Sequence, residues 1–330
     1  MTGVNKQTIE LYTEEAKMLG KLFKQANKGF AVVLASNDGT EIRLIKEIAG
    51  FKKVIGVDPA TNLAKIANSK GLTTINDFFT YKLSKDIIKK WGQADLIVAN
   101  NVYAHIPDPA DMLEGMKNLL KPTGLIEIEV HWLRNLVKEL QIDILYSEHY
   151  YEWTLKAMQI NAHIHGMKVV RAEYLPRQQG GSIRFWLAKS GYEAHALNRI
   201  EAINGLYSIK TMKDLQKRAD ERKRRLVRLI KKLKREGKIV GVWSVPAKIV
   251  TILNFCNLTN NEISFAYEVA PTKIGRYIPK ANILIKDEKE ILKDMPDYLL
   301  IGAWNYMGVA RKVLAPYVAK GGKLINPLVV

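Results

Sequence analysis

The chain has 330 residues, 47% hydrophobic and 25% charged, a composition that excludes a mainly disordered protein. Its single cysteine excludes a disulfide framework and a multi-cysteine zinc site within one chain, and no apolar run is long enough to predict a membrane helix. The net charge of +18 predicts an acidic partner, and the start does not resemble a signal peptide, so we expect a cytoplasmic protein.

Helical and strand-like patterns alternate along the first half of the chain. Residues 1–27 have a helical apolar pattern, and we expect an N-terminal helical segment there. The strand-like runs that follow lie at 30–35, 52–57, 94–99 and 124–130. The helical patterns between them lie near 40–49, 60–69 and 109–120. This alternation predicts a doubly wound parallel sheet, followed by a mixed region at 131–192.

A strongly basic segment separates the two halves. Residues 211–238 contain 13 basic and 4 acidic residues, and their apolar side chains recur at helical spacing. We expect one amphipathic helix with a basic, solvated face, inside a helical linker at 193–237. It lacks the interleaved aromatic residues of a single-strand nucleic-acid binder.

The strand and helix alternation then restarts. Strand-like runs lie at 238–243, 263–268, 297–302 and 323–329, and helical patterns lie between some of them. The fold class is therefore α/β, with one Rossmann-like domain at 28–192 and a second, smaller one at 238–330.

Small and polar residues follow the strands of the first domain, at the sheet edge where such folds bind ligands. The loop at 35–39 lacks the G-x-G-x-x-G pattern of a dehydrogenase, whereas Asp58 can accept hydrogen bonds from both ribose hydroxyls. Their order favours a nucleoside cofactor without a pyrophosphate, S-adenosylmethionine, although each residue alone is equally explained by a turn, a cap or the core. The candidate cofactor contacts are Ala35, Ser36, Asn37, Gly39, Asp58, Pro59, Asp77, Phe78, Asn100 and Asn101.

Ten motifs occur in order between about residues 28 and 330. They are VVLASNDG, GVDPATNLAKIA, DFF, ANNVYAHIPD, LLKPTGLIEIEV, YSEHYY, GGSIRFW, PAKIVTILN, PTKIGRYIP and LIGAWNY. In this order they resemble the sugar C-methyltransferases of deoxysugar biosynthesis. The resemblance implies a class I (Rossmann-like) methyltransferase domain followed by the smaller C-terminal domain. It also implies S-adenosylmethionine-dependent methylation of a carbon of a nucleotide-diphospho-4-keto-6-deoxy sugar.

The chain departs from the family at several places. Members usually begin with a four-cysteine zinc domain, which we do not expect here, and they carry a glutamate at the position of Val33 that helps hold the methionyl group. Restoring that acid, as Val33→Glu, should tighten cofactor binding. The family's His-Gly-Gly-Ser is represented by residues 179–182, which begin with Gln179, and its Gly-x-Gly-Ala-Pro-Ala-Lys by residues 242–248.

Carbon methylation needs a general base that removes the proton beside a ketone and a group that steadies the resulting enolate oxygen. By the resemblance, His149 is the base, Glu148 orients its ring, and Tyr146 hydrogen-bonds the sugar or enolate oxygen. The resemblance also places His105 against the substrate, although the residue alone could equally cap a helix or bind a loop carbonyl.

The sugar diphosphate needs cations and backbone donors. The candidate substrate contacts are Gly180, Gly181, Ser182, Arg184, Lys248, Lys273, Arg276, Tyr277, Trp304 and Asn305. No metal site is expected, because the histidines outside the motifs lack metal-ligand spacing: His131, His163, His165 and His195. Cys256 is expected in the core.

Two alternatives remain open. The basic surface also suits a methyltransferase acting on RNA or on another phosphorylated metabolite. Val33 favours a degenerate, non-catalytic homologue that binds a nucleotide-sugar, whereas the retained Glu148-His149 pair argues against it. The sequence does not specify the sugar, the carbon, its stereochemistry, the nucleotide base or the oligomeric state.

Overall fold

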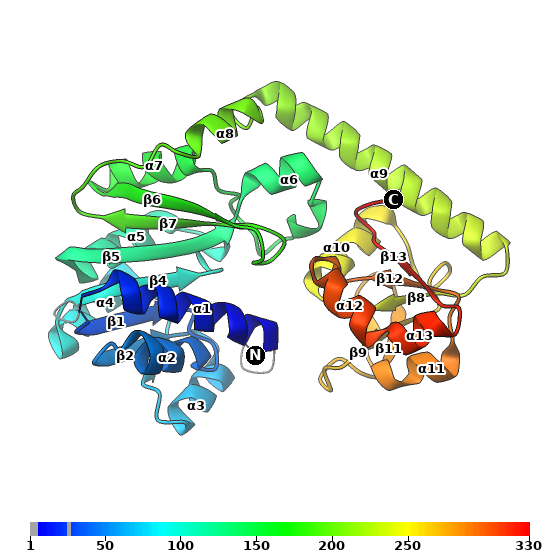
Figure 1. Cartoon of the computed structure of the whole chain (residues 1–330), viewed down its shortest axis with the longest axis horizontal. Coiled ribbons are helices and arrows are strands. Elements are labelled where there is room, and N and C mark those ends of the chain that lie inside the picture. The colour runs from blue at the N-terminus through cyan, green and yellow to red at the C-terminus, as the bar shows by residue number, and fades with distance from the viewer. Residues whose placement is uncertain (1–5, 25–27) are drawn as a thin grey trace. The chain divides into compact units, whose positions relative to one another are not determined.

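The computed structural model describes residues 6–24 and 28–330, and it divides into two compact units. The first unit comprises residues 1–133 and 150–204, and the second comprises residues 134–149 and 205–330. Figure 1 traces the elements of each unit along the chain. Within the described residues, we find no helix with the length and hydropathy needed to cross a membrane.

The first unit contains a seven-stranded sheet in the order β3-β2-β1-β4-β5-β7-β6 (Figure 1). Its strands are β1 (Phe30–Leu34), β2 (Lys53–Val57), β3 (Thr74–Ile75), β4 (Ala94–Asn100), β5 (Leu120–His131), β6 (Lys168–Leu175) and β7 (Ser182–Ala188). The strands from β3 to β5 are parallel, and β7 pairs antiparallel with both β5 and β6. This architecture confirms the expected Rossmann-like α/β class.

Helices cover both faces of this sheet because alternate residues of the buried strands point to opposite sides. Val32 packs with residues of α4, α5 and α7, whereas Val33 packs with residues of α1, α2 and η3. The helices that lie wholly within this unit, among the described residues, are α1 (Lys6–Leu22), α2 (Thr40–Leu44), η3 (Ile45–Ala49), α3 (Thr61–Ser69), α4 (Tyr81–Trp91), η4 (Tyr103–His105), α5 (Pro109–Leu119), α7 (Leu155–Ile164) and α8 (Asn198–Ile203). Local caps set their starts: the Thr80 and Asp108 side chains accept from the first-turn amides of α4 and α5.

The second unit is also α/β, with a six-stranded sheet in the order β10-β11-β9-β8-β12-β13. Its strands are β8 (Val240–Trp243), β9 (Phe265–Glu268), β10 (Tyr277–Ile278), β11 (Ile283–Asp287), β12 (Tyr298–Ile301) and β13 (Lys323–Ile325), parallel except for β10. Its helices are α6 (Leu133–Glu139), η5 (Ile142–Ile144), α9 (Ile209–Arg235), α10 (Ala247–Cys256), η6 (Glu288–Glu290), α11 (Ile291–Asp294), η7 (Trp304–Tyr306), α12 (Met307–Val313) and α13 (Ala315–Ala319).

The basic helix expected at 211–238 is α9, and it buries Leu226, Ile230 and Leu233 in the core of the second unit. Cys256 is packed in the same core. Residues 134–149 group with this unit although they precede β6 and β7 in sequence, and residues 193–204 group with the first. These bounds differ from the domains at 28–192 and 238–330 that the sequence predicts, and those domains stay a prediction.

Candidate active site

The loop after β1 is held in a strained but well-anchored turn. Ala35 and Asn37 both have a φ of 53°, and Gly39 has a φ of 79°. A Cβ at Gly39 would lie 2.6 Å from Leu72 Cδ1, so both the backbone and the space require glycine. The Asn37 amide donates to Asp58 Oδ2 at 2.7 Å, and this bond fixes the loop to the end of β2.

Asp58 is the best-placed acid for a ribose. It is buried to 4% exposure at the end of β2, and its Oδ1 accepts from the Ala60 amide at 2.8 Å. Since a carboxylate offers about four lone pairs, these two backbone bonds leave capacity for hydroxyl donors. At the end of β3, Asp77 is exposed and the Phe78 side chain is 68% exposed, so its ring can stack on a base.

The candidate cofactor residues therefore follow four neighbouring parallel strands, β1 to β4, at one edge of the sheet. The last of them, Asn100 and Asn101, end β4 and begin the next turn, where Asn101 has a φ of 53°. The Asn101 amide donates to the Glu129 carbonyl at 2.8 Å. This edge is the usual ligand edge of such a sheet.

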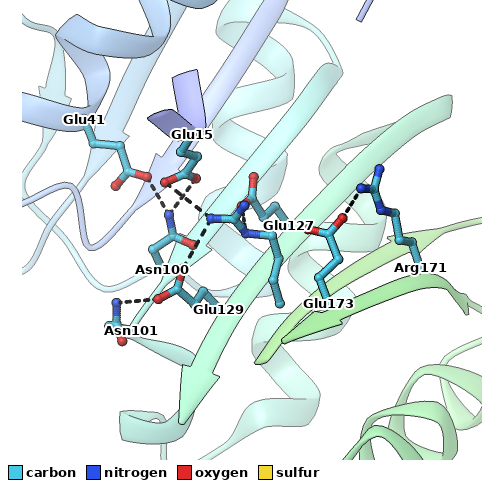
Figure 2. A network of polar contacts seen from close by, with 9 residues as sticks. Glu15, Glu41, Asn100, Asn101, Glu127, Glu129, Arg171 and Glu173 are labelled. Carbon is cyan, nitrogen blue, oxygen red and sulfur yellow. Dashed lines mark hydrogen bonds and ion pairs between the residues drawn. The ribbon is translucent and has the colours of Figure 1, made fainter. Parts of the chain in front are cut away.

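A buried polar network contains Asn100 and Arg184 together with four glutamates that were not among the sequence-based candidates. We call it the carboxylate cluster; its members are Glu15, Glu41, Asn100, Glu127, Glu129 and Arg184, none more than 6% exposed. Figure 2 shows Glu15 and Glu41 pointing at Asn100, whose Nδ2 donates to both at 2.8 Å. The sequence signal for this network is the alternation in β5, where Glu127 and Glu129 interrupt the apolar run at 125–130.

Arg184 is the cation of the carboxylate cluster. Its Nη2 lies 3.3 Å from Glu129 Oε2 and 3.8 Å from Glu15 Oε2, and its Nε pairs with Glu127. Burial alone would lower the pKa of Arg184, but Glu127 and the other carboxylates raise it above its ordinary value. The guanidinium of Arg184 is thus paired with these acids, and its contact with a diphosphate stays a prediction.

The carboxylates of the cluster outnumber its cation. Burial, reinforced by the charge of Glu15, raises the pKa of both Glu41 and Glu127 well above the ordinary range. Burial also raises the pKa of Glu129 to about 7, against the opposing effect of Arg184. Burial therefore favours the protonated form of these three carboxyl groups, and Arg184 opposes that effect.

The three candidates at 146–149 form a compact turn in the second unit. His149 Nδ1 lies 2.7 Å from the Ile144 carbonyl oxygen, and the rings of Tyr146 and His149 have centroids 4.2 Å apart. Since a carbonyl only accepts, Nδ1 carries the proton and Nε2 is the basic nitrogen. His149 and Tyr146 are half-buried, and Glu148 is exposed. His105, in η4 of the first unit, is half-buried, and its amide donates to the Val102 carbonyl.

Two expected substrate contacts lie beside a buried acid that sequence reasoning missed. Trp304 Nε1 donates to Asp143 Oδ2 at 2.6 Å, and Lys248 Nζ lies 3.9 Å from the same oxygen. Lys248 Nζ also lies 5.4 Å from the centroid of the Trp304 ring. Burial raises the pKa of Asp143, and Lys248 opposes that rise.

The remaining substrate candidates are distributed over both units. Gly180 and Gly181, with φ of 93° and 112°, precede Ser182 at the start of β7. In the second unit, Lys273 Nζ donates to the Val245 carbonyl at 2.8 Å and lies 3.3 Å from Glu268. Arg276 and Tyr277 are exposed, and Asn305 is half-buried in η7.

Comparison with known proteins gives matches to both units. Residues 34–197 match the model of a methyltransferase domain, and residues 177–328 match that of a C-methyltransferase C-terminal domain. The C-methyltransferase NovU of Streptomyces niveus is 30% identical over 303 residues, which are 90% of this chain and 71% of that protein.

Solved structures give weaker likenesses. A SAM-dependent methyltransferase from Archaeoglobus fulgidus is 18% identical with a TM-score of 0.43, covering 51% of this chain and 72% of that one. The magnesium protoporphyrin IX methyltransferase of Synechocystis PCC 6803, solved with bound SAM, is 13% identical with a TM-score of 0.41. The match covers 56% of this chain and 80% of that one.

Proposed function

This chain belongs to the S-adenosylmethionine-dependent C-methyltransferases, and on that basis we propose that it methylates a carbon of a nucleotide-diphospho-4-keto-6-deoxy sugar. We place this reaction in deoxysugar biosynthesis in the cytoplasm. The geometry of His149 carries the choice of a ketosugar, because its Nδ1 bond to Ile144 makes Nε2 a proton acceptor.

The residues of the first unit fit S-adenosylmethionine. Asp58 would accept from the ribose hydroxyls, Phe78 would stack on the adenine, and the loop at 35–39 would lie against the methionyl group. Asn100, whose side chain is held by Glu15 and Glu41, ends β4 at the same edge of the sheet. When bound, the cofactor supplies an electrophilic methyl group.

The second unit supplies the acid–base chemistry in this proposal. His149 Nε2 removes the proton from the carbon next to the ketone, and the electron pair of that C–H bond delocalises onto the ketone oxygen as an enolate. Tyr146, packed on the His149 ring, hydrogen-bonds the substrate or the enolate oxygen. The enolate carbon would then form the new carbon–carbon bond with the methyl group that the cofactor supplies, as the bond between that methyl and the cofactor's sulfur breaks and its electron pair stays on the sulfur.

Several residues stay candidates for the nucleotide and its diphosphate. Arg276 is exposed, and within the described residues it forms no ion pair with a carboxylate, so its guanidinium could bind a phosphate. Lys273, in contrast, forms an ion pair with Glu268. Gly180 and Gly181 allow close backbone approach. His105 stays a candidate for a substrate contact from the first unit.

A partial reaction tests the role of His149. His149→Asn should slow both methyl transfer and the exchange of the substrate's α-proton with deuterium by about 10²–10⁴-fold. Glu148→Gln should cause a smaller loss, and the calorimetric affinity for S-adenosylmethionine should not change in either variant. NMR in heavy water measures the proton exchange. Exchange at the parent rate in His149→Asn would mean that another residue is the base, and His105 would be tested next.

The acceptor is tested with labelled S-adenosylmethionine and a panel of thymidine-diphospho-ketosugars. Label transfer to a sugar carbon supports the proposal. The exposed basic face of α9 favours a second candidate, methylation of RNA or another phosphorylated metabolite, and transfer to such an acceptor alone would favour it. Binding of the sugar nucleotide without any transfer would indicate a non-catalytic homologue.

A further inference from the structure

The turn that carries His149 follows directly on a buried anchor in the second unit. Asp143 lies in η5 and has no exposed surface. Its carboxylate is held by two side chains from distant elements, Lys248 at the start of α10 and Trp304 in η7, at 3.9 Å and 2.6 Å. A buried carboxylate with such partners has one stable position, because any other arrangement leaves a charge unpaired.

A second anchor holds the residues just before η5. Arg218 Nη1 donates to the Val137 carbonyl at 2.6 Å, and Arg222 Nη1 donates to the Leu140 carbonyl at 3.2 Å. These carbonyls lie at and just beyond the C-terminal end of α6, where a helix leaves its last carbonyls without intrahelical partners. The two arginines of α9 therefore fix the segment on the side of Asp143 away from His149.

Ile144 connects the two anchored segments to His149. Ile144 follows Asp143 in η5, and its carbonyl accepts from both His149 Nδ1 at 2.7 Å and the Tyr146 amide at 3.0 Å. The direction of this carbonyl decides which ring nitrogen of His149 carries the proton and how the ring is oriented. Any rotation of the 144–145 peptide, which carries this carbonyl, would move the basic nitrogen.

We propose that Asp143, Lys248 and Trp304 are positioning residues for His149, fixing the Ile144 carbonyl that sets its tautomer. The catalytic part of this inference rests on the proposed role of His149 as the base. It gives Lys248 and Trp304 a role apart from contact with the nucleotide-sugar. It also explains why residues 134–149 group with the second unit.

The test compares two substitutions that alter the hydrogen bond at the buried Asp143 carboxylate with a control substitution at a half-buried carboxylate of the second unit. Trp304→Phe removes the indole donor to Asp143, and Asp143→Asn keeps the size of the acceptor but removes its charge. The matched control is Tyr267→Phe, which removes a hydroxyl donor to Asp294 at 3.0 Å, outside this chain of contacts. All are made in the full chain.

The readout is the NMR spectrum of the protein labelled with ¹⁵N-histidine, without substrate, at a pH where the imidazole is neutral. The His149 signals are identified by their loss in His149→Asn. We expect the parent and Tyr267→Phe to show a single tautomer with the proton on Nδ1. In Trp304→Phe and Asp143→Asn, the ¹⁵N chemical shifts of the two ring nitrogens of His149 should move toward the values expected for a mixture of both tautomers.

In the same variants, kcat should fall about 10- to 100-fold, with the affinity for S-adenosylmethionine retained, because a base displaced by about 1 Å loses catalysis on that scale. An unchanged His149 tautomer in both variants overturns the inference. A shifted tautomer together with normal deuterium exchange in His149→Asn keeps the positioning role and rejects His149 as the base. The two failures are therefore distinguishable.

Discussion

At the scale of single residues, Asp58 has two roles that the structure separates. Its Oδ2 accepts from the loop amide of Asn37, and its remaining lone pairs could accept from the hydroxyls of the proposed ribose. We expect Asp58→Ala to weaken S-adenosylmethionine binding by about 1.5–3 kcal/mol, or one to two decades in affinity. Calorimetry measures the loss, and the exposed Asp86→Ala on α4 serves as the control. Parent-like affinity in Asp58→Ala would place the cofactor elsewhere.

Val33 shows how a buried neighbour changes an expectation. By resemblance, Val33→Glu should tighten cofactor binding, but the side chain has no exposed surface and lies beside Val98, whose partner on β5 is Glu127. A further carboxyl here would add to a cluster that has Arg184 as its cation. We therefore expect Val33→Glu to lower the free energy of unfolding by about 3 kcal/mol or more.

The control for that change is Val33→Gln, which has the same size without the charge. Urea unfolding compares the two, and the glutamate variant should be the less stable at pH 8 and approach the glutamine variant at low pH. Higher stability together with tighter cofactor binding in Val33→Glu would restore the expectation from the family.

Glu129 makes stability depend on pH. Its pKa is raised by burial from 4.5 to about 7 in the folded protein, so the folded state binds the proton more tightly than the unfolded chain does. The stabilisation from this group is complete below about pH 4.5 and is lost as the pH rises to about 7, a change of about 3 kcal/mol.

The substitution Glu129→Gln should therefore flatten the pH dependence of the unfolding free energy between pH 5 and 7, without abolishing it, since Glu41 and Glu127 are shifted in the same direction. Urea unfolding across this range measures the slope. The exposed Glu14→Gln, on the surface of α1, should keep the slope of the parent. An unchanged slope in Glu129→Gln would mean that its pKa is not raised.

At the scale of elements, α9 has three faces with different roles. Its apolar stripe packs in the second core, Arg218 and Arg222 bind carbonyls of residues 137–140, and a third set of cations, which includes Arg224, Arg225 and Arg228, is exposed to solvent. The sequence predicts the stripe and the basic face from periodicity. It does not separate the arginines that bind backbone from those that are solvated, because both lie at similar helical positions.

Reversing four exposed charges of α9 tests whether this helix binds nucleic acid. Arg224, Arg225, Arg228 and Lys231 are all exposed. Changing them to glutamate should leave methyl transfer to a sugar nucleotide nearly unchanged, whereas Arg218→Ala with Arg222→Ala should lower it by loosening the segment before His149. RNA binding with a steep salt dependence, lost on the reversal, would favour the RNA alternative.

At the scale of the whole molecule, the proposed roles are divided between the two units. The cofactor candidates follow β1 to β4 of the first unit, and the turn with Tyr146 and His149 belongs to the second. The two family matches, to residues 34–197 and 177–328, together span both units. In the proposed function, methyl-donor binding and proton removal therefore belong to different units of one chain.

The sequence by itself determined the α/β class, the parallel strands, the basic helix and the family, because these depend on apolar periodicity and on ordered local motifs. The turn at 144–149 is also local, since its hydrogen bonds join residues at most five apart. Only the tertiary structure decided which polar side chains pair with one another. Arg184 pairs with Glu15 and Glu127, and Asp143 pairs with Lys248 and accepts from Trp304. These partners lie up to 169 residues apart, so strand order and helix packing, which no local pattern encodes, decide whether a charged side chain faces solvent or a buried partner.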